Sequence, residues 1–329
     1  MREEKSQWQI RSDVSATRLL GDIGGTNARF TLLAGGEFTR TQTIAVADYE
    51  RIEDAIESYL KEVPAGLKPA EAALGVAGPI TGDKIVMINS PWTFSIANLK
   101  KQFGWKALHV VNDFGANALA VPDLSEEFLL QIGDGVPAPD EPIAVLGPGT
   151  GLGVAALVPS PTGWIALTGE GGHATLAALD SREASIIDVL RRQYAHVSAE
   201  TVLSGPGLVN LYDALCELAG KPATPSTPEH ITRLYPGCDP QCREAVAMFC
   251  AILGTFAGDI ALTFGARGGV YIMGGIVPKI HEIFRHSAFR ERFEFKGRFR
   301  DYLSAIPTYV VSHPFPAFLG LKSLFKDSP

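Results

Sequence analysis

The sequence predicts an α/β protein made of two similar halves with a ligand cleft between them. Three observations indicate this. The chain has 329 residues, more than one hydrophobic core usually accommodates, so two domains are the default. Segments with strand character alternate with segments of helical apolar spacing. A glycine-rich stretch between two apolar runs opens the chain at residues 21–30 and recurs at residues 147–158, so the second half restarts the pattern of the first.

The first half predicts three strands, then a helix, then alternating strands and helices. The opening stretch predicts a strand-turn-strand over residues 18–33, and residues 37–46 predict a third strand. Apolar residues recur at helical spacing over residues 49–63. The predicted elements that follow are strands at 72–78 and 84–89, a helix around 95–104, a strand at 107–111 and a helix from about 115 to 121.

The second half predicts strands at 142–147, 163–169, 269–275 and 308–313, with helices between them. Asp180 with Glu183 forms a capping box, and Ser204 with Pro206 opens a helix that Gly220 ends. Residues 245–264 are apolar for about the length of a membrane span. Asp259 and two glycines interrupt this stretch, so we expect a helix buried in a large core.

Composition restricts the class of protein. The net charge of −7 and a pI near 5.6 argue against nucleic acid or an anionic membrane as the main partner. Four cysteines are too few for a disulfide framework in a chain of this length, so we expect a reducing, cytoplasmic compartment. Residues 1–17 are charged and lack the apolar core of a signal peptide. We expect them to form a flexible extension.

The two glycine-rich turns have two interpretations. A Gly-Gly pair between strands is a permissive hairpin turn that needs no function. Alternatively, bare backbone N–H groups cradle a phosphate while an acid at the strand end faces a metal ion through water. Two opposed hairpins would then hold the phosphates of a nucleotide from both sides. The candidate residues are Asp22, Gly24, Gly25, Thr26 and Asn27 in the first turn and Gly149, Thr150 and Gly151 in the second.

The sequence does not support other nucleotide-binding motifs, because the residues around each partial match do not fit. The Walker A pattern is absent, since Gly220-Lys221 is followed by Pro222. The segment GLGVAA at residues 151–156 matches a dinucleotide-binding turn, with Glu170 about twenty residues further on. Prolines at 159 and 161 interrupt the helix that such a site requires, which disfavours a dehydrogenase.

Several polar residues are candidates for a second ligand. Asn112 and Asp113 end a predicted strand, where ligands gather in open α/β sheets, although Asp113 could simply cap the following helix. Glu170 and His173 flank two glycines in a loop, and Glu200 lies just before a helix start. Each of these, taken alone, is more often a surface or structural group.

Two further features have an ordinary alternative. Cys238 and Cys242 near His230 suggest zinc, but their spacing is unlike common zinc motifs, which favours free thiols. Residues 284–303 interleave arginines with phenylalanines, as RNA-binding segments do. Acidic residues dilute the run, and we expect a solvated helical face.

The ordered motifs together resemble the bacterial glucokinase family. They are LGDIGGTNARF, GVAGPITGD, NSPWTFS, NDF, GPGTGLGV, GEGGH, HVSAETVLSGPGLVNLY and GGVYIMGGIVPK, and the resemblance extends from residue 18 to FPAFLG near the C-terminus. It implies an actin-like ATPase (ribonuclease H-like) fold. We expect residues 18–123 with 312–329 to form a small domain and 124–311 a large one, after the extension 1–17. It also implies ATP-dependent phosphorylation of glucose at its 6-hydroxyl, in the glycolytic metabolism of the cytoplasm.

The resemblance assigns roles to the candidate residues. Asp113 looks like the general base on the 6-hydroxyl, and Mg²⁺ and ATP are the implied cofactors. Asp22 looks like a water-mediated metal contact, and Pro148 lacks a phosphate donor that the family often has there, which favours Thr150 and Gly151. The residues expected to hold the sugar are Asn89, Asn112, Asp113, Glu170, His173 and Glu200. The turn expected on the adenosine side is Gly274 and Gly275, which could also be a plain strand-to-helix connection.

Two alternatives remain open at this stage. The chain could phosphorylate another hexose, such as mannose or glucosamine. It could also be a non-catalytic sugar-sensing regulator on the same fold, although the extension before residue 18 is too short for a helix-turn-helix domain. The resemblance also implies a homodimer, with glucose and ATP as ligands and with neither nucleic acid nor membrane as partner.

Overall fold

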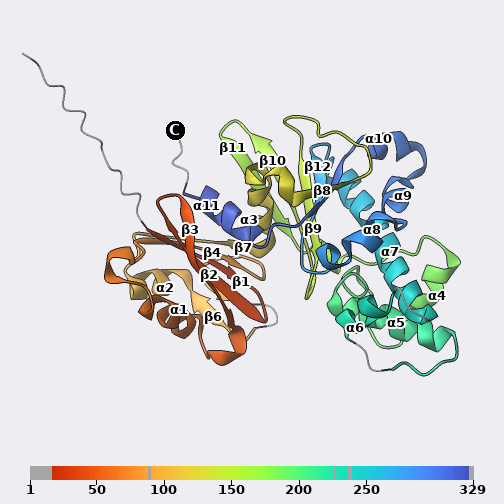
Figure 1. Cartoon of the computed structure of the whole chain (residues 1–329), viewed down its shortest axis with the longest axis horizontal. Helices are drawn as coiled ribbons and strands as arrows, with labels where there is room; N and C mark the ends of the chain where they lie inside the picture. The colour runs from red at the N-terminus through yellow and green to blue at the C-terminus, as the bar shows by residue number, and fades with distance from the viewer. Residues whose placement is uncertain (1–16, 88–89, 225–226, 236–238, 326–329) are drawn as a thin grey trace, which may run out of the picture. The chain divides into compact units, whose positions relative to one another are not determined.

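The computed structural model describes residues 17–87, 90–224, 227–235 and 239–325 (Figure 1). These residues form two compact units. The first contains the described residues up to Leu74 together with Thr81–Val110, and the second contains Gly75–Ile80 and the described residues from Val111 onward. Our predicted partition differs in placing residues 75–80, 111–123 and 312–329 in the first domain, and it stays a prediction.

The first unit is built on a five-stranded sheet. The strand order is β3-β2-β1-β4-β7, with β1 (Arg18–Ile23), β2 (Asn27–Ala34), β3 (Glu37–Ala45), β4 (Glu71–Val76) and β7 (Ala107–Asn112). The first three strands form an antiparallel meander. A two-stranded ribbon of β5 (Lys84–Val86) and β6 (Thr93–Ser95) accompanies the sheet. The predicted opening hairpin and third strand are therefore confirmed.

Local sequence signals account for the helices of the first unit. Helix α1 (Ile52–Lys61) is shorter than predicted, and it buries the apolar face that its spacing indicated. Helix α2 (Ile96–Phe103) begins at Ser95, whose side chain accepts a hydrogen bond from Asn98 N. It ends at Gly104, whose φ of +65° is the left-handed conformation that glycine adopts without strain.

The second unit repeats the strand order of the first. Its sheet runs β11-β10-β9-β12-β13-β8, so the first five strands follow the sequence order 3-2-1-4-5 seen in β3-β2-β1-β4-β7. Strands β9, β10 and β11 form an antiparallel meander, while β12 pairs in parallel with β9 and β13. The predicted restart of the architecture is confirmed. The strands are β8 (Leu129–Ile132), β9 (Ile143–Pro148), β10 (Leu152–Ser160), β11 (Gly163–Gly169), β12 (Gly269–Ile272) and β13 (Thr308–Val311).

Helices cover this second sheet and form most of its core. They are α3 (Asp113–Ala120), α4 (Ser181–Leu190), α5 (Gly205–Leu218), α6 (Pro228–Leu234), α7 (Pro240–Phe264), α8 (His281–Arg285), α9 (Phe289–Glu294), α10 (Arg300–Ser304) and α11 (Pro316–Ser323). Helix α7 is long and apolar enough to cross a membrane, but most of that stretch is buried inside the protein. Methyl groups added at Gly254 and Gly258 would lie 2.1 and 2.6 Å from carbonyl oxygens of α9, so these glycines allow close helix packing. The predicted buried helix is confirmed.

Short 3₁₀ turns connect several of these elements. They are η1 (Val46–Asp48), η2 (Ala65–Leu67), η3 (Val121–Asp123), η4 (Glu126–Phe128), η5 (Gly171–His173), η6 (Val277–Ile280) and η7 (Gly297–Phe299).

The arginine- and phenylalanine-rich run corrects one expectation. We expected a solvated helical face over residues 284–303, but Phe284, Phe289 and Phe293 are fully buried. Arg290 and Arg292 are also largely buried, with side chains 14% and 13% exposed, in ion pairs with acidic residues. The prediction was wrong for these residues, because the phenylalanines belong to the core and the two arginines are held in ion pairs, Arg290 with Glu294 of the same helix and Arg292 with Glu183 of α4.

Candidate active site

The first glycine turn lies between β1 and β2 of the first unit. Gly24 N donates to Asn27 O at 2.9 Å, and Val46 N donates to Thr26 O at the same distance. Thr26 and Asn27 are exposed at the tip. The turn therefore has a fixed backbone with exposed polar side chains.

Asp22 lies at the end of β1, directly opposite Arg29 in the register of β1 and β2. Arg29 Nη1 binds Asp22 Oδ2 at 3.0 Å, and the Asp22 side chain is 21% exposed. Burial raises the pKa of Asp22, and the neighbouring Arg29 acts in the opposite direction through its charge and hydrogen bond. The cross-strand pair thus fixes the orientation of this carboxylate.

The second glycine turn lies between β9 and β10. Gly149 N donates to Gly151 O at 2.8 Å, and Gly205 N, at the start of α5, donates to Gly149 O at 2.8 Å. Ser204 caps α5 by accepting from Gly207 N, as predicted. Because α5 begins against this turn, the positive end of its dipole raises the electrostatic potential there, as an anion site requires.

The glycines after β12 contact the same hairpin. Gly274 has a φ of +87°, and a methyl group added there would lie 2.5 Å from Pro148 O, at the end of β9. Met273 N donates to Leu146 O at 2.8 Å, which holds this segment beside β9. Gly274 and Gly275 are exposed. The structure thus brings the predicted adenosine-side turn next to the predicted phosphate turn.

Glu200 also binds this hairpin. Its Oε2 accepts a hydrogen bond from Leu152 N at 2.8 Å, one residue beyond the turn. Its Oε1 lies 3.9 Å from His173 Nε2, which makes an ion pair only when the imidazole is protonated. The backbone of Glu200 donates to Gly172 O at 2.8 Å. Glu200, His173 and the second hairpin therefore come together in the second unit.

Glu170 is placed by the same loop. It precedes η5, and its carbonyl oxygen accepts from His173 N at 3.0 Å. A methyl group added at Gly172 would lie 2.1 Å from Leu152 O, so this loop packs closely on the start of β10. The Glu170 residue is exposed. The glycines of the GEGGH motif thus allow two polar residues to be held beside the hairpin.

Asn112 and Asp113 join β7 to α3. Asn112 Oδ1 accepts from Gly115 N at 3.0 Å, and Asn112 Nδ2 donates to Gly78 O at 3.1 Å. Asp113 Oδ1 accepts from Phe114 N at 3.0 Å. The helix cap is therefore Asn112, and Asp113 is the first residue of the helix, with its carboxylate on a first-turn N–H.

The remaining candidates are distributed differently. Asn89 lies outside the described residues. Two groups remain among the described candidates. Those of the first turn belong to the first unit, namely Asp22, Gly24, Gly25, Thr26 and Asn27, and the other described candidates belong to the second. Sequence reasoning missed the roles of Gly78, Leu152 and Gly205, whose backbone groups hold the site. All three residues lie within the ordered motifs of the sequence. Hydrogen bonds between backbone groups far apart in the chain do not depend on side-chain type, so they leave no pattern that the sequence could reveal.

The side chains near the site determine whether it could bind a metal ion. Among the residues that the structure describes, no group of three or more His, Cys, Asp and Glu side chains converges. Cys238, one of the two cysteines in the zinc alternative, lies outside that part of the chain. Mg²⁺ keeps several waters and binds one or two carboxylates together with substrate phosphates. A single oriented carboxylate such as Asp22 fits an ion that arrives with a nucleotide.

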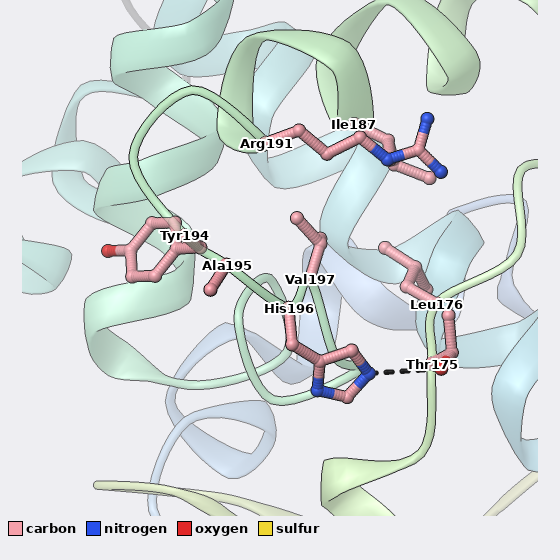
Figure 2. A pocket seen from close by; sticks show the side chains of 8 residues that line it. All are labelled: Thr175, Leu176, Ile187, Arg191, Tyr194, Ala195, His196 and Val197. Atoms are coloured by element: carbon pink, nitrogen blue, oxygen red, sulfur yellow. Dashed lines mark hydrogen bonds between the residues drawn. The ribbon is translucent and has the colours of Figure 1, made fainter.

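A separate pocket of about 330 Å³ lies beside the loop that carries His173 (Figure 2). Figure 2 shows His196 pointing towards Thr175, and His196 Nε2 and Thr175 Oγ1 are 3.0 Å apart. The Tyr194 hydroxyl donates to Asn210, and Arg191 pairs with Asp188. The contact between His196 and Thr175 joins the loop before Glu200 to the loop after His173. The pocket contains none of the predicted site residues.

The repeated strand order and the glycine hairpins define a class of protein, those with an actin-like ATPase fold. A ROK family glucokinase from Streptomyces griseus, solved with glucose and AMPPNP, has this fold, with a TM-score of 0.64 and 18% identity over 94% of this chain and 99% of that chain. A glucokinase from an Antarctic psychrotroph is more similar, with a TM-score of 0.83 and 38% identity over 94% of this chain and 98% of its own.

The sequence comparisons name the family. The glucokinase family model matches residues 19–328. The glucokinase of Paramagnetospirillum magneticum is 53% identical over 312 residues, which are 94% of this chain and 97% of that protein. The chain therefore belongs to the glucokinase family.

Proposed function

We propose that the protein transfers the γ-phosphoryl group of ATP to the 6-hydroxyl of glucose, with Asp113 as the general base. Membership of the glucokinase family and the similarity to curated glucokinases support the reaction. The observation that carries the site assignment is the convergence, within the second unit, of Glu200, His173 and the glycine hairpin. This convergence places side chains that can bind a sugar next to a backbone turn that can bind a phosphate.

The residue types suit the proposed steps. Carboxylates accept paired hydrogen bonds from vicinal hydroxyls, and a histidine adds a donor or an acceptor. Glu170, His173, Glu200 and Asn112 would hold the sugar, with Asn89 as a further proposed contact. Asp113 would accept the proton of the 6-hydroxyl as that oxygen attacks phosphorus. Phosphoryl transfer otherwise depends on positioning and on electrostatic stabilisation of the transferred group.

The nucleotide would bind through backbone groups. Thr150 and Gly151, with the N-terminus of α5 behind them, would contact the phosphates, and Gly274 and Gly275 would line the adenosine side. Gly24, Gly25, Thr26 and Asn27 would contribute the second clasp. Asp22 would hold Mg²⁺ through water, and the ion supplies charge neutralisation of the phosphates. We also propose a cytoplasmic homodimer.

The test of the proposed reaction is a coupled assay of purified protein with Mg-ATP and a panel of glucose, mannose and glucosamine. We expect glucose to give the highest kcat/KM and the product to be the 6-phosphate. A higher value for mannose or glucosamine would identify the alternative hexose kinase. Glucose binding without phosphorylation of any sugar would instead identify a sugar-sensing regulator.

A glycine substitution tests the link between Glu200 and the hairpin. A methyl group added at Gly151 would lie 2.4 Å from Glu200 Oε2, so Gly151→Ala must displace that carboxylate and weaken its hydrogen bond to Leu152 N. We expect the Kd for glucose to rise about 10-fold, which corresponds to about 1.4 kcal/mol and is near the low end for a hydrogen bond to a charged group. Isothermal titration calorimetry measures this Kd.

Gly149→Ala is the matched control for Gly151→Ala. A methyl group at Gly149 meets no atom within 4 Å, so the hairpin accommodates it and Glu200 stays in place. We expect its glucose Kd to stay within about 2-fold of the wild type, a change of less than the ±0.5 kcal/mol typical of neutral sites. Equal effects of the two substitutions on glucose binding would contradict the role of Glu200.

A further inference from the structure

Two glycines of the β9–β10 hairpin leave a space on one face of these strands, and the ring of Phe114 fills it. Gly147 and Gly153 are directly opposite each other in the register of these strands. A methyl group added at Gly153 would lie 1.9 Å from Phe114 Cδ2, and one added at Gly147 would lie 2.8 Å from Phe114 Cζ. The ring of Phe114 therefore occupies the space that side chains at both glycines would need.

Phe114 immediately follows the proposed base. Its own N–H donates to Asp113 Oδ1 at 3.0 Å, so the residue that packs on the hairpin also binds the carboxylate. The next residue is equally confined, because a methyl group at Gly115 would lie 2.7 Å from Thr168 Cγ2 on β11. The first turn of α3 thus packs on three successive strands of the meander (Figure 1).

The same hairpin carries the proposed phosphate turn. Gly147 and Gly153 lie two residues before Gly149 and two residues after Gly151, so the contact with the ring is adjacent to that turn. Leu152, between Gly151 and Gly153, holds Glu200 through its N–H. One short hairpin therefore contains the proposed phosphate turn and contacts both Phe114, the residue after the base, and Glu200, a proposed sugar ligand.

We propose that Phe114 is a positioning residue, whose ring fixes the distance between the carboxylate of Asp113 and the phosphate turn of β9–β10. This inference rests on the proposed role of Asp113. A smaller side chain at position 114 leaves the carboxylate present but lets the first turn of α3 shift on the hairpin. Misplacement of about 1 Å in a catalytic arrangement costs up to about 100-fold in rate.

The first test is Phe114→Leu, with kcat, KM and the glucose Kd measured separately. We expect kcat to fall about 10- to 100-fold, because the geometry of transfer changes. We expect the glucose Kd to change less than about 3-fold, since the sugar ligands on other loops remain, and small changes of this size are typical of sites away from a contact. An unchanged kcat would overturn the proposal, as would a loss confined to glucose binding.

Phe249→Leu is the control for loss of a phenylalanine ring from the core, since Phe114 is itself partly buried. Phe249 lies on α7, is fully buried in the core of the second unit and is remote in sequence from every candidate residue. We expect it to lower the melting temperature at least as much as Phe114→Leu, because its ring is more deeply buried, while keeping kcat near that of the wild type. An equal fall in kcat in both variants would show that the loss of turnover comes from loss of stability alone, and it would overturn the proposal.

A double-mutant cycle tests whether Phe114 acts through the glycine pair. Gly153→Ala forces the ring out of its place, so we expect it alone to lower kcat about 10- to 100-fold. The cycle uses Phe114→Ala, because the Cγ that leucine would keep lies 2.4 Å from a methyl group added at Gly153. In the double variant Phe114→Ala/Gly153→Ala, the added methyl group lies in space that the ring has left. We therefore expect a combined loss clearly smaller than the product of the two single losses. Multiplicative losses would show that the two sites act independently and would contradict the proposal.

Two further variants separate a failure of the role of Phe114 from a failure to fold and from a failure of the proposed base. If Phe114→Leu does not fold, Phe114→Met is measured in its place, because its flexible side chain refills irregular space. Asp113→Ala is assayed in parallel. Normal turnover in Asp113→Ala would overturn the proposed base itself, whereas a large loss there with normal turnover in Phe114→Leu and Gly153→Ala would overturn only the role of Phe114.

Discussion

Asp113→Ala is expected to lower kcat about 10²- to 10⁴-fold, the contribution of a positioned general base. Asn112 still caps α3 in this variant through Gly115 N, so the helix begins at the same residue. The sugar ligands on the loops around Glu170, His173 and Glu200 are also unchanged. We therefore expect the glucose Kd to change much less than kcat. Steady-state kinetics at saturating glucose and ATP, with calorimetric titration of glucose, measure both quantities.

Two controls accompany this variant. Asp113→Asn keeps the size and polarity of the side chain and removes the basic carboxylate, so it should lose about as much turnover as Asp113→Ala. Asp188→Ala removes an exposed acid of the same unit, on α4, where its ion pair with Arg191 is solvent-accessible. Such surface pairs contribute little, and kcat should stay at the wild-type level. Wild-type turnover in Asp113→Asn would remove the base assignment.

Glu183→Gln is expected to destabilise the protein by about 3–5 kcal/mol, the cost of leaving one partner of a buried ion pair uncompensated. The Glu183 side chain is 3% exposed, and its Oε1 binds Arg292 Nη2 at 2.5 Å. Its Oε2 accepts from Leu179 N at 2.7 Å, and Arg292 Nε donates to Thr255. Glutamine keeps the shape of the side chain but leaves the charge of Arg292 buried. The free energy of unfolding in urea, followed by circular dichroism, measures the loss.

The exposed pair Arg51–Asp54 provides the comparison. Its side chains are 62% and 36% exposed and the pair is screened by solvent, so Asp54→Asn should destabilise the protein far less than Glu183→Gln. In the buried pair, the double variant Glu183→Leu/Arg292→Met should recover most of the stability lost in Glu183→Gln, because neither charge remains buried. A loss below about 1 kcal/mol in Glu183→Gln would show that the buried pair is solvated in solution.

Much of the fold follows from local patterns in the sequence. The two glycine hairpins and the cap at Ser204 were predictable, because each depends on residues close together in the chain. The recurrence of the hairpin indicated that the second half restarts the pattern of the first, but the order of strands depends on pairings between distant segments, such as β12 with β9. The capping box was predictable only in part. Asp180 accepts from Glu183 N as expected, but the Glu183 side chain binds Leu179 N and Arg292 instead of the cap residue.

The candidate site shows the same limit. The sequence identified Asn112, Asp113, Glu170, His173 and Glu200 individually, but it did not indicate that Glu200 would bind the hairpin backbone at Leu152, 48 residues away. Nor did it show that Gly147 and Gly153 are opposite each other and contact Phe114, because this depends on strand register and on helix packing. Arg292 and Glu183 are 109 residues apart and meet only in the folded core.

The most direct test of the central claim is a crystal structure of the protein with glucose and a non-hydrolysable ATP analogue. The proposal predicts an Asp113 carboxylate oxygen within about 2.6–3.2 Å of the glucose 6-oxygen, the reach of a general base. It also predicts that the analogue's terminal phosphate contacts the Gly149–Gly151 turn. An Asp113 side chain directed into solvent, with another group on the 6-hydroxyl, would contradict it.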